Sequence, residues 1–95
     1  MLNDKLTAKE KELLVITMEE CSELSFSCSK ILRFGIEPSH LDDILQEAGD
    51  VLCMVSLLLE YDFLEEEPLQ EAVESKLSKL KKWSSIVDNN IGSVH

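Results

Sequence analysis

Two pairs of acidic residues have a spacing that could hold a metal ion. Glu20 and Glu23 lie three residues apart in the segment MEECSEL, and Glu47 and Asp50 lie three residues apart in LQEAGDV. Residues three apart are neighbours on one face of a helix. Each pair therefore forms a small acidic surface if its segment is helical.

Gly35 lies midway between the two pairs. If the chain reverses direction there, Glu23 comes to lie opposite Glu47, and Glu20 opposite Asp50. Four carboxylates at one level repel one another strongly unless something positive lies among them. Oxygen-only ligands of this kind suit magnesium, with manganese as the second possibility. The sequence therefore predicts a magnesium site in a helical hairpin. Magnesium favours sites that it shares with substrate phosphates, so such a site indicates phosphate chemistry.

The acidic pairs could instead belong to an ordinary solvated surface. The chain has 19 acidic residues, so both spacings can arise by chance. Long apolar runs flank both pairs, LLVITM before the first and VLCMVSLLL after the second, and they favour a site over a solvated face. A di-iron bundle normally adds an ExxH histidine, and neither His40 nor His95 has that spacing. The DxDxDG loop of an EF-hand is also missing.

The first predicted helix runs from about Thr7 to Phe34. Thr7 and Glu10 have the spacing of a capping box, and Gly35 fits the left-handed position that commonly closes a helix. An apolar residue recurs every three or four positions, as one face of a helix requires. This series comprises Leu14, Met18, Cys21, Leu24, Cys28 and Ile31.

The second predicted helix runs from about His40 to Glu60, after Pro38 and with Ser39 as its N-cap. Its apolar residues form a stripe too wide for a helix that is covered on one side. We expect this helix to pack against the first helix, the third helix and another subunit. Gly49 costs about 1 kcal/mol relative to alanine in mid-helix; a close approach of the first helix beside the acids would offset that cost, and neutral drift is the alternative.

The third predicted helix begins near Pro68, which suits a first helical position, and ends in the basic segment KLKKW at Trp83. From about residue 84 the pattern lapses into a frayed or oligomer-docked tail. Alternating strand patterns are missing. The predicted fold is an all-α antiparallel helical bundle, with three main helices per chain in a single domain of residues 1–95, completed by oligomerisation.

Length, charge and cysteine usage restrict the kind of protein. A chain of 95 residues can form only a small core, so we expect a homo-oligomer, either a dimer or a tetramer. A net charge of −10 argues against a nucleic-acid partner. No segment has the roughly 20 apolar residues of a membrane span, and the polar start lacks the apolar stretch of a signal peptide. Cys21, Cys28 and Cys53 form no CxxC, and we expect them to be reduced, buried residues of a cytoplasmic protein.

The order of the acidic motifs resembles a known family. Glu19-Glu20-Cys21-Ser22-Glu23, a gap and Glu47-Ala48-Gly49-Asp50 match the EExxE and ExxD motifs of the MazG-like, all-α nucleoside triphosphate pyrophosphohydrolases. The resemblance covers about residues 12 to 83. It is strongest to short bacteriophage members, which have segments similar to CSKILRFG (residues 28–35) and KLSKLKKW (residues 76–83) of this chain.

The resemblance implies magnesium-dependent hydrolysis of a nucleoside triphosphate, or its deoxy form, to the monophosphate and pyrophosphate. It also implies that Glu20, Glu23, Glu47 and Asp50 hold the metal. Glu23 is our choice for the carboxylate that also orients the attacking water. Glu19 is interpreted as either a supporting residue or a solvated one.

Several residues near these motifs could contact the substrate. Lys30 and Arg33 follow Glu23 by about two and three turns, so both could reach phosphate oxygens, and exposed cations at a helix end are the alternative. Lys76 and Lys79 flank the apolar stripe of the third helix. Trp83 could stack on a base or be buried against a partner subunit.

Two alternative functions stay open. One is the phosphoribosyl-ATP pyrophosphohydrolase of histidine synthesis, which has related acidic motifs, although the RFG and KLKKW segments argue against it. The other is a non-catalytic helical adaptor or sensor that binds a nucleotide or a metal.

Overall fold

The computed structural model describes residues 5–87, which form three α-helices and no strand. The helices are α1 (Ala8–Phe34), α2 (Pro38–Glu60) and α3 (Glu66–Trp83). This confirms the predicted all-α class. The chain divides into two compact units, Met1–Phe63 and Leu64–His95, and each is described by itself. That they form a single domain stays a prediction.

Helix α1 begins with the predicted capping box. The Thr7 hydroxyl accepts a hydrogen bond from the Glu10 backbone N–H at 3.0 Å, and the Glu10 carboxylate accepts one from the Thr7 N–H at 2.8 Å. Two N–H groups that have no partner inside the helix are satisfied in this way. The helix then continues for 27 residues to Phe34, as expected.

Gly35 ends α1 in a conformation that only partly matches the prediction. Its φ of 89° is positive, as expected, but its ψ of 176° is extended rather than left-handed helical. This region is nearly restricted to glycine. The extended ψ leads the chain directly into Glu37, itself extended, from which α2 starts. The His40 ring closes the turn, because its Nδ1 lies 2.9 Å from the Gly35 carbonyl oxygen.

Helix α2 starts earlier than predicted, and Ser39 is not its N-cap. The N-cap is Glu37, Pro38 occupies the first turn, and no side chain caps the helix. The Glu37 carbonyl accepts hydrogen bonds from the N–H groups of His40 and Leu41 at 2.9 and 3.1 Å. Proline has no N–H to satisfy and a φ already suited to the first helical position. This preference outweighs the hydroxyl cap that Ser39 would offer.

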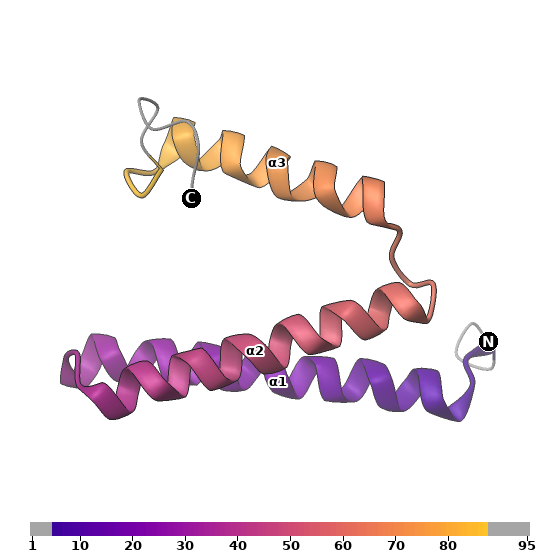
Figure 1. Ribbon diagram of the computed structural model, residues 1–95, viewed down its shortest axis with the longest axis horizontal. Coiled ribbons are helices and arrows are strands. Elements are labelled where there is room, and N and C mark those ends of the chain that lie inside the picture. Colours follow the sequence, from indigo (N-terminus) through magenta and orange to yellow (C-terminus); the bar gives the residue numbers. More distant parts are fainter. Residues whose placement is uncertain (1–4, 88–95) are drawn as a thin grey trace. The chain divides into compact units, whose positions relative to one another are not determined.

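Helices α1 and α2 lie side by side and run antiparallel (Figure 1). The residues buried in α1 are Leu13 and Ser27, and Met54 is buried in α2. The predicted apolar face of α1 is therefore displaced, since Met18 is 70% exposed and Cys21 is exposed as well. A helix cannot turn both this stripe and its acidic residues toward α2, so the stripe lies partly open.

The three cysteines are free, as predicted, but all are exposed rather than buried. Cys21 and Cys28 belong to the displaced stripe of α1, and Cys53 lies beside Met54 on α2 without sharing its burial. The interpretation of these residues as small core hydrophobes is wrong for this unit.

Helix α2 carries exposed apolar residues on the side away from Met54. Leu45 is 74% and Leu52 is 67% exposed, and Leu41 is exposed too. Gly49 is exposed on the same helix, and a Cβ atom added there would meet nothing within 4 Å. The predicted close approach of α1 at Gly49 is therefore wrong. Packing of this helix against α3 and another subunit stays a prediction.

Helix α3 begins at Glu66, two residues before the predicted start, with Glu65 as its N-cap. Pro68 is still in the first turn, where N–H groups lack intrahelical partners, so its missing N–H has no cost. The Leu69 N–H makes the first bond, to the Glu65 carbonyl at 3.0 Å. The helix ends at Trp83 with Lys81 and Lys82 in its last turn, as predicted. Residues 84–87 are not helical, and the rest of the predicted tail, 88–95, lies outside the described residues.

Within the described range, no helix combines the length and apolar character that crossing a membrane requires.

Candidate metal site

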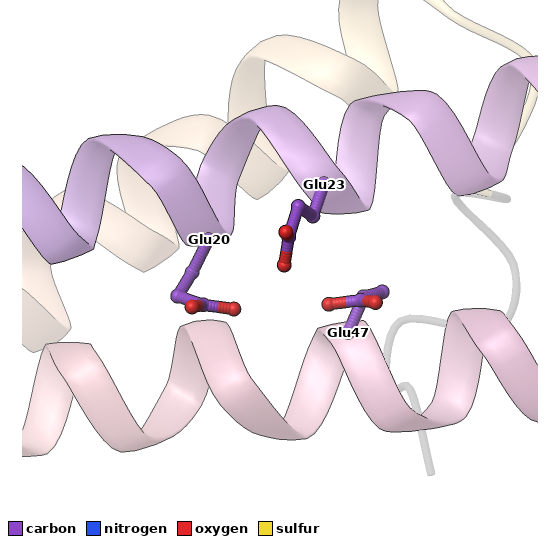
Figure 2. Close-up of side chains that lie close together, drawn as sticks. All are labelled: Glu20, Glu23 and Glu47. Carbon is purple, nitrogen blue, oxygen red and sulfur yellow. The ribbon is translucent and has the colours of Figure 1, made fainter.

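Three acidic side chains converge between α1 and α2. Glu20 and Glu23 come from α1 and Glu47 from α2, and one oxygen from each lies within 4.8 Å of the others. Figure 2 shows the three carboxylates pointing into the space between the helices. The hairpin thus brings together residues from both acidic motifs, with Glu23 beside Glu47 as the antiparallel register requires.

The three carboxylates differ in their contact with solvent. Glu20 and Glu47 are half-buried, and Glu23 is exposed. One oxygen of Glu20 and one of Glu47, Oε1 in each, are covered from solvent and have no hydrogen-bond partner among the described residues. A buried oxygen acceptor without a donor is costly. These two oxygens are therefore the atoms in the site that most need a positive partner.

The pKa values of Glu20 and Glu47 also show that negative charge is disfavoured in this cluster. Loss of solvent, followed by the negative charges of Glu23 and Asp50, raises the pKa of Glu20 above its ordinary value of 4.5. The pKa of Glu47 is raised from 4.5 by the same causes in the same order. Desolvation and like charges both disfavour an ionised carboxylate. Without a counter-charge, the site resists the ionised state that metal binding requires.

Asp50, the fourth predicted ligand, lies next to this group. It is half-buried and close enough to raise the pKa of both Glu20 and Glu47. The Gln46 side-chain amide donates to Asp50 Oδ1 at 3.4 Å, one turn earlier on α2. Asp50 is thus at the edge of the cluster, with one oxygen engaged by Gln46.

Lys30 makes an ion pair across the hairpin. Its Nζ lies 2.8 Å from Asp43 Oδ2, so it connects α1 to α2 near their closed end. The hydrogen bond and charge of Lys30, with a smaller contribution from His40, lower the pKa of Asp43 below its ordinary value of 3.8. The predicted role of Lys30 in substrate binding has to compete with this contact.

Arg33 lies against aromatic rings. Its guanidinium carbon is 5.9 Å from the centroid of the Phe26 ring and 5.1 Å from that of Phe34. Arg33 is exposed. Its donor groups are therefore available to a ligand from solvent.

The other two predicted substrate-binding residues, Lys76 and Lys79, belong to the second unit and are exposed on α3. Lys79 helps to line an open hollow of about 520 Å³, together with Ser75, Ser78, Lys81, Lys82 and Trp83. Trp83 is among the most exposed apolar residues described. The second unit is described by itself, so a role for Lys76 and Lys79 at the acidic cluster stays a prediction.

Sequence reasoning missed Asp43 and Phe26. The register that pairs Glu23 with Glu47 places Lys30 opposite His40, one turn from Asp43, so numbering could have indicated the ion pair. Phe26 follows Glu23 by one turn, and its exposure was not visible in the sequence.

The arrangement fits a small divalent cation. Oxygens around one magnesium ion lie at most about 4.2 Å apart, so oxygens within 4.8 Å are a small side-chain rotation from a coordinating set. The donors are all carboxylates, which suit magnesium or manganese and not a softer metal. The two covered oxygens without donors are an observation that is independent of the spacing of the acids.

Comparisons with protein-family models, with curated proteins and with solved structures found no match to this chain. Over residues 5–87, fold and site together define a small all-α protein of three helices with an acidic cluster between the first two.

Proposed function

We propose that this chain is a MazG-like, magnesium-dependent nucleoside triphosphate pyrophosphohydrolase that acts as a homo-oligomer in the cytoplasm. It hydrolyses a nucleoside triphosphate, or its deoxy form, to the monophosphate and pyrophosphate. The observation that carries the proposal is the convergence of carboxylates from both acidic motifs, two of them with a covered, donorless oxygen.

In this proposal Glu20, Glu23, Glu47 and Asp50 hold the metal. When bound, magnesium supplies the positive charge that balances the triphosphate and increases the acidity of a water molecule. Glu20 and Glu47 are half-buried between the helices, so they fix the position of the site. Asp50 supports it from the next turn of α2.

Glu23 is the exposed member of the cluster. A carboxylate that reaches solvent can accept a hydrogen bond from a water molecule and turn its oxygen toward phosphorus. The proposed role of Glu23 is to orient the attacking water and to accept its proton. Its exposure supports this assignment over Glu20, whose carboxylate lies deeper.

Positive side chains contribute to binding of the phosphates. Arg33 lies in the last turn of α1, beyond the acidic residues of that helix, and presents its guanidinium to solvent. Lys30 reaches phosphate only when the substrate competes with Asp43 for its ammonium group. The substrate-binding role of Lys76 and Lys79, which belong to the second unit, rests on the sequence alone.

An assay with a panel of nucleoside triphosphates and magnesium tests the proposal. Wild-type protein should release pyrophosphate, and Glu47→Gln should lower turnover at least about 100-fold, because even residues that merely support a metal ligand are worth about 10- to 100-fold. Glu19→Gln is the matched control, since Glu19 is an exposed acid beside the cluster. It should retain near wild-type turnover.

Three other outcomes would replace the proposal. Equal turnover by wild type and Glu47→Gln would remove the acidic cluster from the reaction. Activity confined to phosphoribosyl-ATP would identify the histidine-synthesis enzyme instead. Tight binding of an intact triphosphate without release of pyrophosphate would identify a non-catalytic sensor.

A further inference from the structure

Four side chains near the closed end of the hairpin form an aromatic and cationic surface, which we call the Phe26 patch: Phe26, Lys30, Arg33 and Phe34. The two phenyl rings are 58% and 62% exposed. The Arg33 guanidinium lies near both rings, and Lys30 Nζ is 5.3 Å from the centroid of the Phe26 ring. Each cation therefore lies within the usual range of a cation–π contact.

The Phe26 patch begins where the acidic cluster ends. Glu23 and Phe26 are three residues apart on α1, so they are neighbours on the helix surface, about 4.5 Å apart along its axis. A molecule whose phosphates meet the acidic cluster through a metal would extend its remaining part over Phe26 if it lay along α1. The distance is within the length of one nucleotide.

The charge pattern of α1 changes at this point. Between residues 12 and 29 its charged residues are all acidic, and Lys30 and Arg33 are the first cations that follow. Lys30 is engaged by Asp43. Among the described residues no carboxylate lies within 4.0 Å of Arg33. A guanidinium is planar, stacks on aromatic faces and donates to phosphate in fixed directions.

We propose that the Phe26 patch holds the nucleoside part of the substrate, with the base against the Phe26 ring and the Arg33 guanidinium donating to the phosphate nearest the base. This rests on the proposed function, because the acidic cluster must hold the other phosphates. An anion with a flat aromatic group satisfies both the rings and the cation. Stacking on a ring tolerates any base, so the expected preference among bases is weak.

Binding measured by calorimetry on the full chain with magnesium tests this inference. The two probes are a nucleoside triphosphate with a methylene bridge between the first two phosphorus atoms, and inorganic triphosphate. Phe26→Leu keeps an apolar side chain but removes the ring, and it should weaken binding of the nucleotide about tenfold or more. It should leave binding of inorganic triphosphate unchanged, and Phe26→Tyr should restore nucleotide binding.

Phe63→Leu is the matched control. Phe63 is 37% exposed and follows α2, at the opposite end of that helix from the patch. This variant should bind both probes like wild type.

The outcomes separate this inference from the proposed function. If Phe26→Leu weakens both probes equally, or neither, Phe26 does not hold the base. If Phe26→Leu instead changes the oligomeric mass in light scattering, the ring is an interface between chains and the inference is overturned. If wild type binds inorganic triphosphate as tightly as the nucleotide, only this inference fails. If wild type binds neither probe with magnesium, the proposed function fails and the inference falls with it.

Discussion

Glu20 and Glu47 are held in a place that disfavours their own charges. Both are half-buried, both have an oxygen without a donor, and each has other carboxylates as neighbours. A purely structural residue at these positions would be expected to be apolar or paired, since buried charges are normally compensated. The cost of the cluster in the free chain is the physical reason to look for a ligand there.

The free chain should become more stable as pH falls toward the ordinary carboxyl range. The pKa values of Glu20 and Glu47 are raised on folding, so their favourable contribution is complete below about 4.5 and is lost as pH rises through the raised pKa values. The contribution of Asp43 to stability changes with pH in the opposite direction. Its pKa is lowered on folding, so its contribution is present above about 3.8 and is lost as pH falls further. Denaturant unfolding with a chelator, between pH 4.5 and 7, measures the slope.

Glu47→Gln supplies the comparison for that slope. It removes one of the mutually repelling charges, so the metal-free variant should be more stable than wild type at pH 7 and should depend less on pH. A wild-type stability that rises steadily from pH 4.5 to 7 would contradict the strain assigned to the cluster.

Metal ions should reverse the order of stability. A ligand that binds only the folded state stabilises the protein. At free ligand concentrations above Kd, this stabilisation grows with the logarithm of the concentration, and the melting temperature rises with it. Thermal unfolding at pH 7 with increasing magnesium or manganese should show this rise for wild type and for Glu19→Gln, and little of it for Glu47→Gln. Parallel shifts in all three chains would mean that the ions act elsewhere.

On the scale of helices and turns, two glycines should respond oppositely to the same change. Gly49→Ala should raise the free energy of unfolding by about 1 kcal/mol, since alanine favours the helix and its Cβ meets nothing within 4 Å. Gly35→Ala should lower it by about 1 kcal/mol or more, because φ there is 89°. Thermal melts should separate the two variants by several degrees on each side of wild type.

Gly49→Ala also reports on what surrounds α2. The space beside Gly49 is open within the first unit, so destabilisation by this substitution would show that a helix from outside this unit, such as one of a second chain, packs against Gly49.

Local signals in the sequence predicted local structure well. The capping box was predictable because Thr7 and Glu10 satisfy each other within one turn, and the register of the hairpin followed from the position of Gly35. The start of α2 could not be predicted to the residue, because Ser39 as an N-cap and Pro38 as a first helical residue favour different starting points. The face of α1 was also mispredicted, because period alone cannot choose between an apolar stripe and an acidic one beside it.

The site was predictable only in part, for a similar reason. Glu20, Glu23 and Glu47 share a face once the hairpin forms, and their numbering gives that directly. The register places Lys30 opposite His40 and so restricts its partner to the nearby acids Glu37, Asp42 and Asp43, among which side-chain reach decides. The exposure of Phe26 depends on the rotation of α1 about its axis, and the wrongly predicted apolar face gave the wrong rotation.

For the whole molecule, the main feature is how little apolar surface the first unit buries. Among described residues, Leu13 and Met54 are the buried hydrophobic side chains, while Leu41, Leu45 and Leu52 remain exposed. Large contiguous apolar surface usually marks an interaction site. This supports the proposal that the protein acts as an oligomer.

Light scattering should therefore give a mass that is a multiple of 10.8 kDa, as a dimer or a tetramer. Leu52→Glu places a charge in the exposed apolar face without touching the acidic cluster, so it should shift the mass toward that of one chain. Glu19→Gln should leave the mass unchanged. A wild-type protein of monomer mass at high concentration would contradict self-association.

The proposed chemistry depends on one cation held between α1 and α2 by the two acidic motifs. Anomalous diffraction from crystals grown with manganese tests this binding, because the signal locates the ion itself. We expect an anomalous peak between the carboxylates of Glu20, Glu23 and Glu47, close to Asp50, that vanishes in Glu47→Gln. Crystals with manganese bound elsewhere, and with these carboxylates turned toward bulk solvent, would contradict it.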